Sequence, residues 1–172
     1  MSPANSASSL AGIAEHRADA EAALRLLFSP VNPDYTVRFA AYLPREITSD
    51  LAQRLEETDL QSSLAALAEV EALLRRDYQW RCRAKQADNV SIALRKIYKR
   101  RGARARLDDD IMRTWSDNIV PADRAIISRL RGMLRFRHWL AHGRHWNRGP
   151  VYQFQDVYLV ANAVIECLAL KS

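Results

Sequence analysis

The residues best suited to chemistry are concentrated in one stretch, residues 135–146, which holds three of the four histidines of the chain. Within it, Arg137 and His142 have complementary properties. A histidine titrates near neutral pH and serves as acid or base, and an arginine carries a permanent planar cation that suits a phosphate. Metal-free cleavage of RNA needs a base for the 2′-hydroxyl, an acid for the leaving 5′-oxygen and a cation on the phosphate. We therefore take Arg137 and His142 as the candidate catalytic pair.

The apolar pattern around Arg137 places this residue on the inner side of a helix. Ile126, Leu130 and Met133 form a stripe with helical spacing, and Arg137 continues it after four residues. A buried arginine is costly without a partner, so we expect Arg137 to line a cleft or an interface groove. The alternative is a stem that packs while the guanidinium reaches water.

His142 cannot meet Arg137 on one straight helix, because five residues correspond to a rotation of about 140°. Gly143 would let the chain turn at this point and redirect the imidazole. A histidine in a last turn also caps the helix and faces its negative end, which is the simpler interpretation. A two-fold dimer that unites two Arg–His pairs would supply both an acid and a base.

This arrangement resembles the R-x4–6-H signature of HEPN domains. The motif arginine corresponds to Arg137, the polar residue after it to His138 and the motif histidine to His142. Arg135 also fits the looser spacing, with six residues between it and His142. The resemblance extends loosely over residues 46–168 and is specific only from Arg137 to His142.

Membership of this family would imply a helical bundle that dimerises with the motif at the interface and cleaves RNA without a metal or other cofactor. Arg137 and His142 would be catalytic and His138 would support them. Relatives include toxins that pair with an antitoxin, stand-alone toxins, defence factors and noncatalytic modules. In toxins that pair with a nucleotidyltransferase antitoxin, a tyrosine stands two residues after the histidine. Here that position is Arg144, which puts such regulation in doubt.

Other interpretations of the same residues stay open. His138, His142 and His145 would align on an unbroken helix as zinc ligands, but Gly143 and the neighbouring arginines argue against a metal site. We assign no catalytic role to the carboxylates Glu69 and Glu71, because a spacing of two places them on different sides of a helix.

The aromatic residues in and after the motif stretch have two possible roles. Trp139, Trp146 and Tyr152 could stack on unpaired bases. Packing in the core is the preferred interpretation for Trp139, because large aromatic side chains commonly bury in helical bundles.

The charge is distributed unevenly along the chain, whose net charge is +6. Residues 1–74 carry 5 Lys or Arg against 11 Asp or Glu, and residues 75–148 carry 20 against 7. A block this basic predicts contact with a polyanion such as RNA. The alternatives are a solvated surface or a dimer face that pairs with the acidic residues 1–74. The residues expected to bind RNA are Arg135, Arg144, Trp146, Lys99, Arg100 and Arg101.

The periodicity predicts an all-α bundle of about five to six helices. We divide the chain into an N-terminal helix with a connecting segment, residues 1–45, and a helical bundle, residues 46–172, which together form one compact domain. The stretch from Tyr35 to Leu43 is aromatic and β-branched and is expected to be extended or a short strand. A long helix is expected to start at Thr48.

The remaining features indicate a cytoplasmic protein. No segment is apolar enough to span a membrane, and the first residues lack the pattern of a signal peptide. Cys82 and Cys167 are expected to be buried, reduced thiols, with a disulfide between them as the less favoured alternative. The chain is therefore expected to be an endoribonuclease, or else a noncatalytic helical module that binds RNA or a protein. A DNA-binding regulator is a weaker third candidate, because no clear helix-turn-helix is present.

Overall fold

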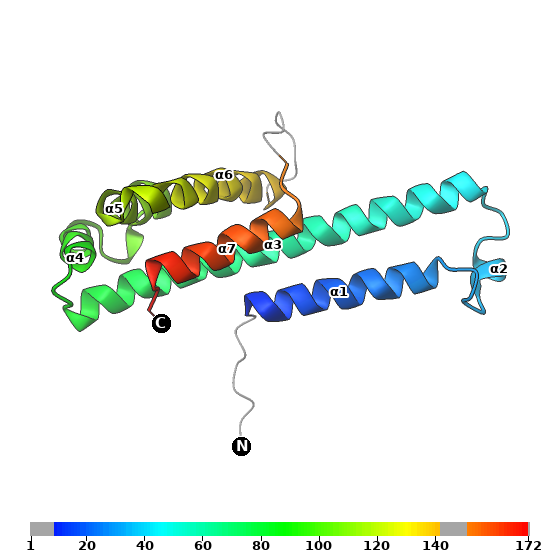
Figure 1. Ribbon diagram of the computed structural model, residues 1–172, viewed down its shortest axis with the longest axis horizontal. Helices are drawn as coiled ribbons and strands as arrows, with labels where there is room; N and C mark the ends of the chain where they lie inside the picture. The colour runs from blue at the N-terminus through cyan, green and yellow to red at the C-terminus, as the bar shows by residue number, and fades with distance from the viewer. Residues whose placement is uncertain (1–8, 142–150, 172) are drawn as a thin grey trace, which may run out of the picture.

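The computed structural model describes residues 9–141 and 151–171, which are helical throughout apart from their connections (Figure 1). The predicted all-α fold is therefore confirmed for these residues. The α-helices are α1 (Leu10–Leu27), α2 (Tyr35–Arg38), α3 (Pro44–Ala84), α4 (Asn89–Arg101), α5 (Arg113–Asn118), α6 (Arg124–Ala141) and α7 (Phe154–Leu168). The connections include two 3-10 turns, η1 (Gly102–Arg104) and η3 (Pro121–Asp123), and a π-helical segment, η2 (Leu107–Met112).

Helix α3 is the axis of the molecule, and its 41 residues span about 60 Å at the usual helical rise (Figure 1). Helix α1 runs antiparallel to α3 along its N-terminal part, while α6 and α7 lie along the C-terminal part. Helix α3 begins at Pro44, four residues before the predicted start at Thr48. Proline suits a first turn, and the Glu46 carboxylate accepts a hydrogen bond from the Leu43 N–H at 2.8 Å.

The main core is built around the C-terminal half of α3. Leu67, Val70 and Leu74 are fully buried there, and each is one helical turn from the next. Buried side chains from α4, η2, α5, α6 and α7 pack in the same cluster. Leu10 and Ile13 from the start of α1 belong to it as well, so the N-terminal helix shares the core of the bundle.

The stretch from Tyr35 to Leu43, expected to be extended, instead contains the helical turn α2. The prediction was wrong because the aromatic residues here have helical spacing. Tyr35 and Phe39 are four residues apart, and their ring centroids lie 5.0 Å from each other. Phe39 also lies 5.0 Å from Phe28, so this turn closes a small aromatic cluster at the end of the α1–α3 hairpin.

The cysteines differ from the prediction of two buried thiols. Cys82 is half-buried and Cys167 is exposed, and both are free. Burial raises the pKa of the Cys82 thiol, which makes it a poor nucleophile at neutral pH. Among the described residues no helix is both long and apolar enough to cross a bilayer.

A buried ion pair joins four elements near the C-terminal end of α3. The Arg81 Nε lies 2.9 and 3.0 Å from the two carboxylate oxygens of Asp77, whose side chain is completely buried. The Lys171 N–H, after α7, donates to the same carboxylate at 2.8 Å. Arg81 also reaches Ser91 of α4 at 3.2 Å, and its guanidinium lies 4.7 Å from the centroid of the Trp115 ring in α5. Burial raises the pKa of Asp77, and the Lys171 N–H and Arg81 oppose this rise.

Replacing Asp77 by alanine is predicted to destabilise the fold by about 3–5 kcal/mol, because a buried guanidinium would lose its main partner. Chemical denaturation followed by circular dichroism measures this loss. The matched control is Asp117→Ala, since Asp117 forms an exposed pair with Arg113 at 4.0 Å. That substitution is expected to change the free energy of unfolding by less than about 1 kcal/mol. Equal effects of the two substitutions would contradict a structural role for Asp77.

Candidate functional site around the end of α6

Helix α6 positions the candidate site by packing against two different clusters. Ile127, Leu130 and Met133 belong to the main core. One turn further on, Phe136 and Trp139 pack with Leu60 of α3 in a second, smaller cluster. The Trp139 ring is 8% exposed and nearly parallel to Phe136, with centroids 5.9 Å apart. The preferred interpretation of Trp139 as a core residue is confirmed, and this packing fixes the end of α6 against α3.

Arg137 is held by a carboxylate from α3. Its Nη1 lies 3.1 Å from Glu71, and the Arg137 side chain is 33% exposed. The other carboxylate oxygen of Glu71 lies 3.0 Å from Arg75, so one acid bridges two arginines. The Arg137 Nε is buried and has no hydrogen-bond acceptor among the described residues. Arg137 therefore has the partner that its inward position requires, and part of its guanidinium stays accessible.

Glu71 is the residue that the sequence did not reveal. Its spacing of four from Arg75 indicates a local pair on one helix. Nothing in the sequence links it to Arg137, which lies in a different helix 66 positions later. Only the packing of α6 on α3 brings the two together.

His138 lies on a different side of α6 from Arg137, because successive residues are rotated by about 100°. It lines a groove between α6 and η2 together with Arg131, Leu134 and Arg135 of α6. The opposite wall consists of Leu107, Asp108 and Met112, and the cavity has a volume of about 590 Å³. The structure thus brings His138 and Arg135 together but directs His138 away from Arg137.

The four predicted RNA-binding residues that the structure describes lie in two separate places. Arg135 is exposed in the groove, whereas Lys99, Arg100 and Arg101 end α4. The end of α4 lies beside Tyr78, whose hydroxyl donates to the Gly102 carbonyl at 2.8 Å. The end of α6 lies beside Leu60, and the stretch of α3 between Leu60 and Tyr78 corresponds to about 27 Å. Arg101 is also engaged by Asp110, at 3.4 Å.

Several predicted residues fall in the segment 142–150, outside the described residues: His142, Gly143, Arg144, His145 and Trp146. Their positions relative to Arg137 are therefore predictions from the sequence. Within residues 9–141 and 151–171, no group of three or more His, Cys, Asp or Glu side chains is arranged to hold a metal ion.

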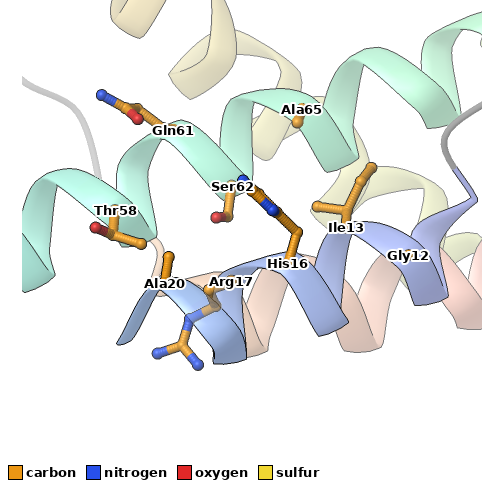
Figure 2. Close-up of a pocket in the computed structure, with 9 residues that line it drawn as sticks. All are labelled: Gly12, Ile13, His16, Arg17, Ala20, Thr58, Gln61, Ser62 and Ala65. Atoms are coloured by element: carbon orange, nitrogen blue, oxygen red, sulfur yellow. The ribbon is translucent and has the colours of Figure 1, made fainter. Parts of the chain in front are cut away.

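A second cavity, of about 480 Å³, lies between α1 and α3 (Figure 2). His16 extends across it toward Ser62 of α3, while Arg17 points away (Figure 2). Arg17 is engaged by Asp59 at 2.6 Å and by Glu21 at 3.1 Å. Small residues of both helices leave this space open, and the sequence had indicated no site here.

A third cavity, of about 440 Å³, lies on α3, where its lining includes Trp80, Arg76 and Arg83. Arg76 is engaged by Glu69 at 2.7 Å.

Comparisons of the chain with protein-family models, curated proteins and solved structures find no match.

Tyr152, which lies just before α7, packs against α6. Its ring meets the Phe136 ring edge-on, with centroids 5.6 Å apart. Its hydroxyl occupies the space beside Gly132, where an added Cβ would lie 2.7 Å from the oxygen. The absence of a side chain at Gly132 is what allows this close approach. Tyr152 therefore holds the residues just before α7 against α6.

We predict that Gly132→Ala destabilises the native protein but stabilises a Tyr152→Phe variant. In the native protein the new methyl group displaces the hydroxyl, at a cost of about 1–3 kcal/mol that the helix-propensity gain of about 1 kcal/mol offsets only in part. In Tyr152→Phe the nearest atom is the ring carbon at 3.8 Å, so only the helix-propensity gain of about 1 kcal/mol remains. Unfolding free energies of the four proteins form a double-mutant cycle. A coupling energy near zero would show that the two residues do not meet.

Proposed function

We propose that this chain is a metal-independent endoribonuclease of HEPN type, with Arg137 and His142 as its catalytic residues. The observation that carries the proposal is the combination of support and exposure at Arg137. Its Nη1 lies 3.1 Å from Glu71, and its side chain is nevertheless 33% exposed. A guanidinium held in a fixed orientation before substrate binds stabilises a developing charge more effectively than a mobile one. A surface arginine that only extends into water would not need this support.

The proposed reaction is an internal transfer at phosphorus. A histidine removes the proton from a ribose 2′-hydroxyl, and the oxygen attacks the adjacent phosphorus. The bond from phosphorus to the 5′-oxygen breaks, and that oxygen takes a proton from a second acid. Arg137 neutralises the extra negative charge on the phosphoryl oxygens. The products are a 2′,3′-cyclic phosphate and a 5′-hydroxyl, and no metal or other cofactor takes part.

An RNA cleavage assay in the presence of EDTA tests this proposal. We expect cleavage by the native protein to yield cyclic-phosphate ends and to fall by at least about a hundredfold in Arg137→Ala and His142→Ala. The matched control is Arg129→Ala, because Arg129 is an exposed arginine of the same helix. Its activity should stay close to that of the native protein. Loss of all cleavage in EDTA, restored by a divalent metal, would contradict the proposal.

The proposal includes a homodimer, because one Arg–His pair offers a single titratable group for two proton transfers. Light scattering at micromolar concentration is expected to give about twice the chain mass of 19.6 kDa. A monomer at this concentration that still cleaves RNA would show that the second proton-transfer group belongs to the same chain.

The second candidate function is a noncatalytic helical module that binds RNA or a protein. The contact of Arg137 with Glu71 favours it, because the carboxylate offsets part of the arginine charge. RNA binding without cleavage, equal in the native protein and both alanine variants, would support this alternative. A role as a cytoplasmic toxin or defence factor, with or without an antitoxin, is a further part of the proposal that follows from the HEPN resemblance alone.

A further inference from the structure

The groove between α6 and η2 has features that catalysis by Arg137 and His142 does not require. Its floor is apolar, with Met112 only 2% exposed and Leu107 and Leu134 half-buried. Its volume of about 590 Å³ lies within the range of small-molecule sites, which typically combine apolar walls with a few polar groups. An open apolar floor of this kind is suited to a flat, uncharged ring.

The rim of the groove carries two arginines, a histidine and the Asp108 carboxylate, and one of the arginines is already paired. The Arg131 Nε lies 2.6 Å from the Asp108 carboxylate, and this pair joins α6 to η2 across the groove. Arg135, one turn further along α6, is exposed and forms no ion pair with any described residue. His138 completes the rim on the next turn. The groove therefore offers an uncommitted guanidinium next to an apolar floor.

We propose that this groove binds one nucleotide of single-stranded RNA, with the base on Leu107, Met112 and Leu134 and the phosphate on Arg135 and His138. A phosphate alone would not need the apolar floor, and an apolar peptide would not need the uncommitted arginine. Single-stranded RNA presents both groups in every nucleotide, since an unstacked base is available for apolar contact beside its phosphate. The inference rests on the proposed function for its choice of RNA.

The position of the groove makes it a site for positioning substrate. His138 directly follows Arg137 in the sequence, so a nucleotide in the groove lies on the adjacent side of the same helix turn. The groove would then hold a nucleotide near the scissile phosphate and set which base is accepted there. The role of His138 becomes substrate binding, in place of the supporting catalytic role that the sequence suggested.

Binding of a fluorescent single-stranded RNA tests this site, with every 2′-hydroxyl replaced by fluorine so that no cleavage occurs. Arg135→Ala and Leu134→Trp, which fills the floor, should each weaken binding about tenfold. Arg129→Ala removes the same charge from a part of α6 outside the groove and should change binding less than about twofold. The inference is overturned if the Arg135 and Arg129 variants lose affinity equally, which would indicate diffuse charge attraction.

Competition on the native protein provides a measurement that does not depend on the folding of any variant. Nucleoside monophosphates are expected to displace the labelled RNA at concentrations at least about tenfold lower than inorganic phosphate or ribose 5-phosphate. Equal displacement by all three competitors would show that the floor does not bind a base. Absence of RNA binding in the native protein would also overturn the inference and would favour a protein partner.

The outcomes separate the groove from the proposed nuclease. If the native protein binds RNA through the groove but does not cleave an ordinary RNA in EDTA, the nuclease proposal fails and the groove stands. If it cleaves RNA and the groove variants cleave and bind as well as the native protein, the groove fails and the nuclease stands.

Discussion

The buried pair of Asp77 and Arg81 is the constraint on which the C-terminal half of the molecule depends. The carboxylate is fully enclosed and accepts from Arg81 and from the main chain at Lys171. The guanidinium extends to Ser91 and lies over Trp115. Charges removed from water need partners with good geometry, and the contacts of this pair tie α4, α5 and the residues after α7 to α3.

Because α3 is one continuous helix, contacts that fix its C-terminal end also fix the positions of residues earlier in the same helix. The ion pair anchors it near residue 80, and Glu71 lies less than two turns before Asp77, so the carboxylate that contacts Arg137 is part of the same rigid element. The packing of Phe136 and Trp139 on Leu60 fixes where α6 lies along α3, and this position brings Arg137 to the Glu71 carboxylate. The orientation of Arg137 is thus set by packing at a second cluster outside the main core. The groove beside it depends likewise on Asp108, which fastens η2 to α6 through Arg131.

Local signals in the sequence predicted the helices where they were strong. Asp88 caps α4 and Gly102 ends it with a positive φ of 55°, and each residue type is typical of its position. The prediction for residues 35–43 failed because the helical spacing of Tyr35 and Phe39, together with a contact from outside the segment, outweighed strand-like composition. Phe39 is buried against Phe28 across a turn, so a segment with strand-like composition became helical.

The sequence by itself determined the all-helical class, the uneven charge and the inward position of Arg137, because each follows from residue type and from spacing along one helix. It also marked Trp139 as a core residue, because large aromatic side chains commonly bury in helical bundles. Only the tertiary structure decided that Glu71 would be the partner of Arg137, and that His138 and Arg135 would share a groove with η2 instead of meeting Arg137. These choices depend on how helices far apart in the chain pack against each other. The periodicity of a single helix gives the direction of a side chain and says nothing about what it meets.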